Sequence, residues 1–375
     1  MRTFSGLMLL IVGCSAPPSG VDGGTAGGQG TSAGGSASSG GGNAGGGTTA
    51  GGGTTAGGSA AGGSASSSTG LFERVHGWNK DVSALPKSGR SDAILAALNG
   101  FGGWGNGNKL QTDFSIPLFF ADASTPRRTI IQPAGGSCYG GTDCETLPMQ
   151  MPVPVNANIE GATGFTCDVA NEDCHLLVVE RSEKKLYELY NSTASGQSLA
   201  ALGAFVWDLT KQYGEVLRGE QCTSADAAGL PIAALLPTAD EVAAGEVPHA
   251  LRFILPNARM KRGVYVRPAT HAGGPTSMNA DAPPYGVRFR LKASFTETSF
   301  TPGARVILRA LKRYGMVLSD GGNIALTFAD DRTTTAKWSG VGITAQTFNA
   351  IRVDDFEVVD LGAEIPRNAD CTRAP

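Results

Sequence analysis

Basic and aromatic side chains gather in the last third of the chain, where three of them alternate along one predicted strand. In the segment 285–292, Arg288, Arg290 and Lys292 would project from one side and apolar residues from the other, because successive strand residues face opposite ways. Neighbouring segments add side chains of the same kinds: His249, Arg252, Tyr265, Arg267 and His271. Arginine binds carboxylate or sulfate groups at two points, and histidine or tyrosine can transfer protons. We therefore expect a sheet face that binds an acidic polysaccharide. An exposed face with ordinary solvated charges is the alternative.

A second set consists of carboxylates that lie close to aromatic residues in the sequence: Glu180, Glu188, Asp208 and Asp226. His175, at the start of a predicted strand, is a separate candidate for a catalytic or ligand role. Glycoside hydrolysis needs a carboxylic acid and a carboxylate at a defined separation, and Trp207 could stack on a sugar ring. The sequence alone brings no two of these groups together. In the structural alternative, Glu180 is a surface strand residue and Asp226 belongs to a turn or cap.

Familiar catalytic signatures do not occur. We find no Gly-x-Ser-x-Gly, His-Glu-x-x-His or phosphate-binding glycine pattern, and the glycines of 100–107 follow a predicted helix instead of opening one. We therefore predict no bound cofactor and no metal. A metal site formed by the cysteines is the weaker alternative, because their spacing is not Cys-x₂-Cys and the chain has only 4 histidines.

The N-terminus has the features of an exported protein. Arg2 precedes a short apolar run at 7–12, and 11–14 reads Ile-Val-Gly-Cys. This segment resembles the bacterial lipobox, in which a small residue precedes a cysteine that is diacylated after cleavage. The resemblance implies a signal peptide over 1–13, a palmitate-type lipid anchor on Cys14, and a location in the cell envelope at the outer membrane or cell surface. An ordinary secretory signal is the alternative.

Residues 14–70 then form a predicted tether. From 19 onward this stretch consists almost entirely of Gly, Ser, Ala and Thr, which offer too little apolar surface to offset the entropy cost of ordering. A chain of this kind spans roughly 40 Å on average. The globular domain is predicted over 71–375.

Six of the 7 cysteines remain once Cys14 is set aside. An even number in an exported protein indicates disulfides. Two pairs would close short turns rich in Gly, Asp and Asn, which leaves a third, long-range pair. The predicted pairs are Cys138 with Cys144, Cys167 with Cys174, and Cys222 with Cys371.

The charge of the chain argues against nucleic acid as a partner. The 30 basic and 33 acidic residues give a net charge of −3, whereas nucleic-acid-binding domains are usually basic. No later apolar run approaches the roughly 20 residues of a membrane-spanning helix. We expect a monomer that is attached to the membrane only through its lipid.

Most of the domain has the pattern of β-strands. Helices are predicted after Ser91, Thr238 and Thr301, with a fourth over 344–352. Strands are predicted at 116–120, 128–132, 175–180, 185–190, 204–209, 250–255, 264–267, 287–292, 316–318, 324–328 and 356–359. Hairpins at 181–184 and 319–323 favour a mainly β, antiparallel sandwich or jelly roll in one domain, with a few short helices.

Residues 71–360 resemble a domain of secreted bacterial proteins of unassigned function. The stretches that carry the resemblance are 175–180, 186–189, 206–209, 223–230, 249–252, 267–271 and 314–316. This resemblance implies export and no particular activity. The leading hypothesis is a cell-surface domain that binds or cleaves carbohydrate, as a glycoside hydrolase or polysaccharide lyase if it is an enzyme. The alternative is a non-catalytic adhesion lipoprotein that binds a protein or cell-wall partner.

Overall fold

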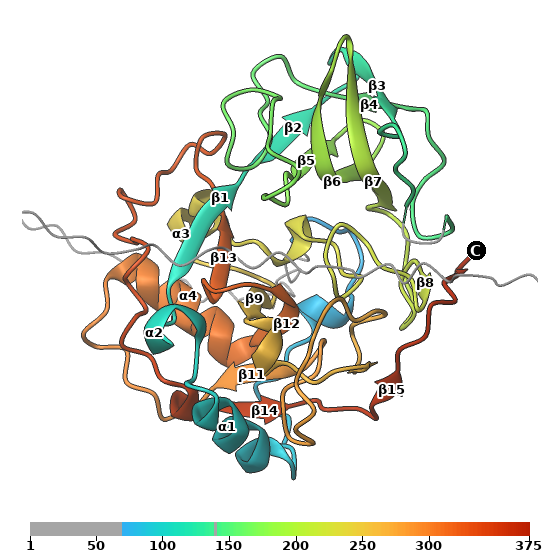
Figure 1. The fold of residues 1–375 in the computed structure, drawn as a ribbon. Helices are drawn as coiled ribbons and strands as arrows, with labels where there is room; N and C mark the ends of the chain where they lie inside the picture. The colour runs from blue at the N-terminus through green and yellow to red at the C-terminus, as the bar shows by residue number, and fades with distance from the viewer. Residues whose placement is uncertain (1–69, 139–140) are drawn as a thin grey trace, which may run out of the picture. The chain divides into compact units, whose positions relative to one another are not determined.

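The computed structural model describes residues 70–138 and 141–375. They contain two six-stranded sheets, and the consecutive strands β1 and β2 belong to one sheet each (Figure 1). The predicted signal peptide, Cys14 and the tether up to 69 lie outside the described residues. The described residues belong to one compact unit.

The first sheet has the strand order β1-β13-β9-β12-β11-β14. Its members are β1 (Thr112–Ile116), β13 (Leu326–Ala329), β9 (Leu251–Leu255), β12 (Met316–Gly321), β11 (Arg288–Leu291) and β14 (Phe356–Val359). β1 runs parallel to β13 and β9 parallel to β12, and the other neighbours are antiparallel. Helix α1 (Ser91–Gly100) packs on β14 and α4 (Pro302–Arg313) packs on β11.

The second sheet has the order β2-β5-β6-β7-β3-β4. Its members are β2 (Leu118–Ala121), β5 (Leu176–Glu180), β6 (Lys185–Ser195), β7 (Ser198–Asp208), β3 (Arg127–Ile131) and β4 (Met149–Pro152). Pro117, which has no N–H to donate to a ladder, separates β1 from β2. The chain therefore passes from one sheet to the other at this point, as the teal arrows of Figure 1 show.

Short elements complete the fold. Two-residue strands pair as β10 (Val264–Tyr265) with β15 (Ile365–Pro366), and as β8 (Gly219–Glu220) with β16 (Thr372–Arg373). Helix α3 is Ala239–Ala244, and 3₁₀ turns occur at Gly77–Asn79, Ala233–Leu235, Asn257–Arg259 and Val353–Asp355. The turn labelled α2 (Gly105–Asn108) is not a regular helix, because three of its residues have positive φ. Among the described residues, no helix is long and apolar enough to cross a bilayer.

Helix caps follow from the sequence as predicted. The hydroxyl of Thr301 accepts from the backbone N–H of Ala304 at the start of α4, and Pro302 occupies the first helical position. Thr238 and Glu241 form a reciprocal capping box at the start of α3. The predicted fourth helix is wrong: most of 344–352 forms turns, although Phe348 and Ile351 are buried.

The prediction of a mainly β domain with few helices is confirmed, but the sheets are mixed instead of antiparallel. The 181–184 hairpin joins β5 to β6 as predicted. The 319–323 turn does not form a hairpin, because β9 lies between β12 and β13. Strand β9 has a continuous apolar run at 253–255 and takes a central position, which suits strands that are buried on both faces.

The three disulfides pair as predicted. Cys222 and Cys371 are 149 residues apart in the sequence, so this bond holds the C-terminal segment against the middle of the chain beside the β8–β16 pair. The larger apolar core contains side chains from both sheets, among them Phe253 and Phe289 of the first sheet and Phe205 of the second. A smaller core includes Ile130, Met151 and Leu176 of the second sheet.

Candidate functional site

One row of residues crosses the first sheet from strand to strand and includes Arg288 and Arg252. Val317 of β12 is the register partner of Arg288 in β11 and of Arg252 in β9. Thr327 of β13 is hydrogen-bonded to Arg252 and is the register partner of Asp113 in β1. Because register partners share a face of the sheet, these polar side chains lie on one face. Arg288 and Arg252 are separated by two strand spacings, about 10 Å between their backbones.

At the β11 end of the row, the chain segment 77–85 covers the arginines. Arg288 donates hydrogen bonds to the carbonyl oxygens of Gly77, Lys80 and Tyr314. Arg290 donates to three carbonyls of 82–85 and pairs with Glu357 at 2.7 Å. Both side chains are buried, so they are neither solvated nor an open polysaccharide-binding face. Their hydrogen bonds hold the segment 77–85 against the sheet.

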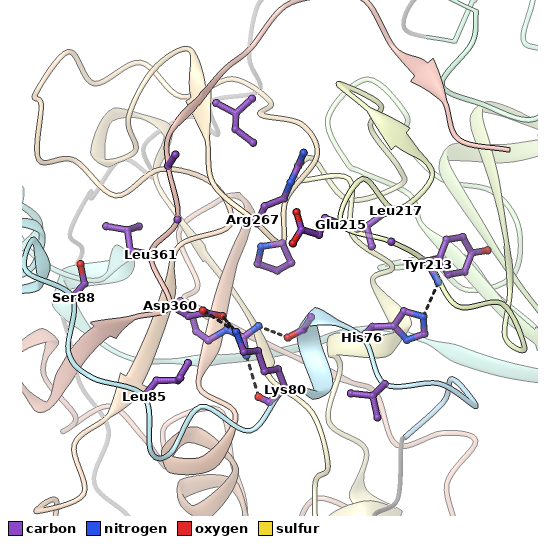
Figure 2. A pocket seen from close by; sticks show the side chains of 18 of the residues that line it. His76, Lys80, Leu85, Ser88, Tyr213, Glu215, Leu217, Arg267, Asp360 and Leu361 are labelled. Carbon is purple, nitrogen blue, oxygen red and sulfur yellow. Dashed lines mark hydrogen bonds and ion pairs between the residues drawn. The ribbon is translucent and has the colours of Figure 1, made fainter.

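A cavity of about 1160 Å³ opens beside this segment (Figure 2). It is lined by His76, Lys80 and Leu85 on one side, by Tyr213 and Leu217 from another loop, and by Arg267, Arg288 and Asp360. A cavity of this size is large enough for a small-molecule ligand. We call it the strap cavity, after the segment 77–85 that forms one of its walls.

At the centre of the row, Arg252 connects three side chains. Its Nε donates to Asp226 at 2.9 Å, one terminal nitrogen donates to Thr327 at 3.0 Å and the other to Asp320 at 2.9 Å. Burial lowers the pKa of Arg252, but the two carboxylates outweigh burial and raise it above its ordinary value. Burial raises the pKa of Asp226 to about 7 against the attraction of Arg252. Asp226 is therefore the member of this group that gains a proton near neutral pH.

At the β1 end, Ser115 joins two carboxyl groups. Its hydroxyl lies 2.7 Å from Asp113 Oδ2 and 2.9 Å from Glu160 Oε1. A hydroxyl has one hydrogen, so both contacts are full hydrogen bonds only when one carboxyl is protonated and donates to Ser115. Burial and the charge of Glu160 raise the pKa of Asp113, although Ser115 opposes this. Its raised pKa makes Asp113 the carboxyl that takes up this proton more readily than Glu160.

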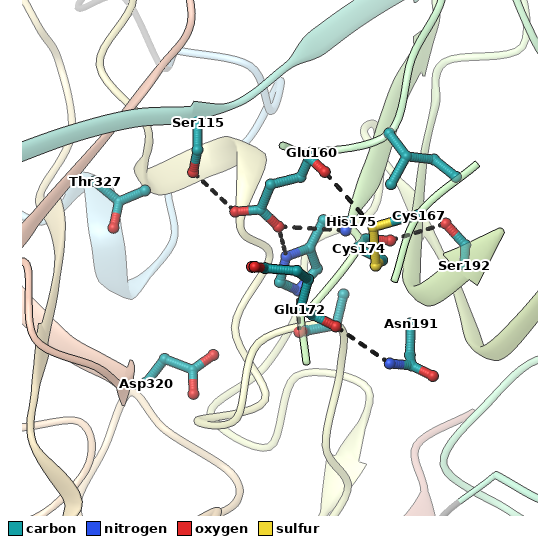
Figure 3. A network of polar contacts seen from close by, with 12 residues as sticks. Ser115, Glu160, Cys167, Glu172, Cys174, His175, Asn191, Ser192, Asp320 and Thr327 are labelled. Atoms are coloured by element: carbon teal, nitrogen blue, oxygen red, sulfur yellow. Dashed lines mark hydrogen bonds and ion pairs between the residues drawn. A yellow bond between two sulfur atoms is a disulfide. The ribbon is translucent and has the colours of Figure 1, made fainter. Parts of the chain in front are cut away.

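Glu160 keeps its charge because of His175 (Figure 3). His175 Nδ1 lies 2.6 Å from Glu160 Oε2, and Nε2 lies 3.1 Å from the carbonyl oxygen of Ala225. Both ring nitrogens face acceptors, so the ring is a protonated imidazolium. Burial opposes both charges, but their attraction raises the pKa of His175 to about 9 and lowers the pKa of Glu160 to about 2.

These contacts form a ring. On one side, His175 contacts Ala225, which precedes Asp226 in the chain. On the other side, Thr327 contacts Arg252 and is the register partner of Asp113. We call it the polar ring: Asp113, Ser115, Glu160, His175, Asp226, Arg252 and Thr327, with Asp320 attached to Arg252. The side chains of Asp320 and Glu160 are 22% and 17% exposed, whereas those of Arg252, His175 and Asp226 are 5% exposed or less. The partly exposed groups of the ring, Asp320 and Glu160, are therefore acidic, and the cationic groups Arg252 and His175 lie buried beneath them.

The His175–Glu160 pair predicts a pH dependence of stability. A raised folded pKa of His175 stabilises the fold fully below its ordinary pKa of 6.5, and this contribution is lost as the pH rises toward 9. Over pH 6.5 to 8 we expect the free energy of unfolding to fall by about 2 kcal/mol from this group. The lowered pKa of Glu160 produces the opposite loss only on acidification, from its ordinary 4.5 down toward 2.

Denaturant unfolding of the wild type and of His175→Gln, measured from pH 5 to 9, tests this expectation. Asp226 titrates in the same range, so the informative quantity is the difference between the two proteins. That difference should shrink as the pH rises. A difference that stays constant between pH 6.5 and 8 would show that His175 is neutral in the fold.

The structure brings three of the sequence-predicted candidates together: His175, Asp226 and Arg252. His271 lies next to them, because its Nδ1 is 2.8 Å from the carbonyl oxygen of Ala227, the residue after Asp226. Burial lowers the pKa of His271. This histidine is thus a neighbour of the ring that does not share its ion pairs.

The other candidates lie apart, each with its own partner. His249 pairs with the capping residue Glu241 at 3.5 Å. Tyr265 and Arg267 both donate to Glu220. Arg288 lies beneath the segment 77–85. The four basic or histidine side chains at 249, 252, 267 and 271 therefore do not form a single binding face.

The remaining carboxylate candidates have local structural contacts. Glu180 accepts from Ser182 and Glu183 within the β5–β6 turn, and Asp208 accepts from Thr210 in an exposed turn. Trp207 is fully buried and donates to Glu188 at 3.0 Å, so it is not placed to stack on a sugar. Burial raises the pKa of Glu188 to about 7.

Sequence reasoning missed five members of the site: Asp113, Ser115, Glu160, Asp320 and Thr327. Asp113 and Ser115 alternate around Phe114, a period-2 signal that could have been read as a polar strand face. Asp320 was attributed to the 319–323 hairpin turn. Glu160 lies in a long irregular stretch without any periodic signal.

The polar ring does not assemble a metal-binding donor set. Within 70–138 and 141–375, one group of three His, Cys, Asp or Glu residues has ligand atoms within 4.8 Å of one another, namely Asp143, Cys222 and Cys371. Its two sulfur atoms are joined as a disulfide, and Asp143 accepts from the backbone of Thr223. A thiolate ligand needs a free cysteine, so this group does not suit a metal.

In comparisons with known proteins, no family model, curated protein or solved structure matches the chain.

Proposed function

We propose that this protein is an exported, lipid-anchored protein of the cell envelope whose domain processes carbohydrate by acid catalysis at the polar ring. The observation that carries the proposal is that two carboxyl groups, those of Asp113 and Glu160, contact the single hydroxyl of Ser115. Glycoside hydrolysis uses two carboxyl groups whose surroundings push their pKa values apart. In the polar ring Asp113 has a raised pKa, whereas the pKa of Glu160 is about 2.

The roles follow from protonation. Asp113 donates its proton to the glycosidic oxygen as the bond to the leaving sugar breaks. The carboxylate of Glu160 stabilises the positive charge that develops at the anomeric carbon. A water molecule then adds to this carbon and passes a proton back to Asp113, which completes the hydrolysis and restores the acid. His175 and Arg252 are positioning residues, because they hold Glu160 and Asp320 in place and do not touch the substrate. Glycoside hydrolysis is favoured over polysaccharide lyase chemistry because the two accessible carboxyls supply an acid and an anion.

The location and attachment are part of the same proposal. Three disulfides suit an oxidising compartment outside the cytoplasm, and a lipid at Cys14 with a tether over 14–70 would hold the domain at the outer membrane or cell surface as a monomer. We also propose that the two sheets pack as a sandwich, which is supported by the apolar core to which both contribute.

Glycan cleavage by the exported protein tests the proposal. The protein is incubated with acidic and neutral polysaccharides, and new reducing ends and the absorbance of unsaturated uronates are measured. Hydrolysis is expected to release reducing ends without ultraviolet absorbance. An increase in absorbance would instead indicate a lyase. Binding without turnover of any glycan would support the non-catalytic adhesion protein.

A further inference from the structure

The strap cavity has an unusual buried cation in its wall. Arg288 is 2% exposed, and its guanidinium contacts only backbone carbonyl groups. Among the described residues, no carboxylate lies within 4.0 Å of it, and its Nε has no hydrogen-bond partner. The desolvation of Arg288 lowers its pKa to about 10, and the charge of Asp360 offsets this only in part. A buried cation without a contacting anion favours the approach of a negative ligand.

Basic residues outnumber acidic residues in the lining of the cavity. The lining contains four basic residues, Lys80, Lys87, Arg267 and Arg288, against two acidic ones, Glu215 and Asp360. Lys80 pairs with Asp360 at 2.9 Å, and their side chains are 48% and 33% exposed. Figure 2 shows these two groups pointing toward one another. Exposed ion pairs of this kind are weak, so a ligand carboxylate can compete with Asp360 for Lys80.

Hydrogen-bonding and apolar groups complete the lining. His76 Nδ1 is buried and has no hydrogen-bond partner among the described residues. Leu85, Leu217 and Leu361 supply apolar walls. A ligand with one anionic group, hydroxyl groups and apolar ring faces would satisfy all three kinds of surface.

We propose that the strap cavity is the binding site for a carboxylate-bearing sugar, with Lys80 contacting the carboxylate and Arg288 supplying buried positive charge behind it. This inference rests on the proposed function and names its substrate class as acidic glycans. The strap cavity and the polar ring are placed along the same face of the first sheet, about 10 Å apart between the backbones of Arg288 and Arg252. The strap cavity is therefore a separate pocket near the polar ring, and none of its lining residues belongs to the ring.

Calorimetric titration of the exported protein with two disaccharides tests this site. The probes are cellobiouronic acid and cellobiose, which differ in one carboxylate. The titrations use the Asp113→Asn variant, so that turnover does not disturb the measurement. We expect the acidic disaccharide to bind at least tenfold more tightly than the neutral one, with an affinity that falls as salt is added. Equal affinities for the two sugars would overturn the proposal.

Lys80→Met locates the binding. In the Asp113→Asn background it should lower the affinity for cellobiouronic acid at least fivefold and leave cellobiose unchanged. Lys185→Met is the matched control, because Lys185 has a similar exposure of 44% and an ion pair with Glu183 but lies on the second sheet. Equal losses in both variants, or none in Lys80→Met, would contradict the site. Acid-selective binding without any glycan cleavage by the wild type would reject the proposed function and leave this site standing.

Discussion

The Asp113→Asn variant is expected to lose glycan turnover by about 10²- to 10⁴-fold, the usual contribution of a positioned general acid. Asparagine keeps the size of the side chain and can still donate to Ser115 through its amide, so the fold around Ser115 should persist. It has no proton to give to a leaving sugar oxygen. The loss should therefore appear in kcat, with little change in KM.

The pH profile of the wild type provides an independent readout. The pKa of Asp113 is raised, so its protonated form persists to a higher pH than that of an ordinary aspartic acid. Activity should fall as the pH rises through this raised pKa, and the residual activity of Asp113→Asn should lack that limb.

Asp208→Asn is the control for the removal of a carboxylate. Asp208 lies in an exposed turn and its contacts are local, so its loss should leave turnover within twofold. Wild-type turnover in the Asp113→Asn variant, or equal losses in both variants, would remove Asp113 from the chemistry.

The sequence carried more information about local structure than about the site. Helix caps at Thr238 and Thr301, the β5–β6 hairpin and the three disulfides depend on residues that are close in sequence or on counting cysteines, and these were predicted correctly. Strand order depends on which apolar runs become central. The turn at 319–323 has strong hairpin chemistry, yet β9 separates the strands on either side.

The polar ring shows why the site itself was harder to predict. Its members come from β1, β9, β12 and β13 and from loops, so no short sequence window contains more than two of them. Asp226 and Arg252 were recognised by residue type, and their contact is 26 residues apart in the sequence. The arginine alternation at 288 and 290 was a correct strand pattern, but the segment 77–85 covers that face. Period-2 alternation shows which side chains share a face and not what covers it.

Asp226 and Arg252 also link the site to the stability of the fold. Asp226 is fully buried, and one of its oxygen atoms, Oδ2, has no hydrogen-bond partner among the described residues. Arg252 is thus the main group that compensates this carboxylate. A buried ion pair often stabilises a fold no more than well-packed apolar residues would, but the removal of one partner leaves the other charge uncompensated.

Arg252→Met is therefore expected to lower the free energy of unfolding by about 3 to 5 kcal/mol. Methionine approximates the stem of arginine and removes the three hydrogen bonds to Asp226, Thr327 and Asp320. Denaturant unfolding at pH 7 measures the loss. Both the wild type and the variant should become more stable toward pH 5, because the raised pKa of Asp226 favours its protonated form in the fold.

Two further variants separate this explanation from a general effect of losing an arginine. Arg127→Met removes an exposed ion pair with Glu183, whose side chains are 39% and 34% accessible, and should cost less than about 1 kcal/mol. The double variant Arg252→Met with Asp226→Leu removes the fully buried ion pair and should be more stable than Arg252→Met alone, because the only carboxylate left without Arg252 is the partly exposed Asp320. If the double variant is the less stable of the two, the cost of Arg252→Met arises from lost packing, and the charge of Asp226 is not what Arg252 compensates.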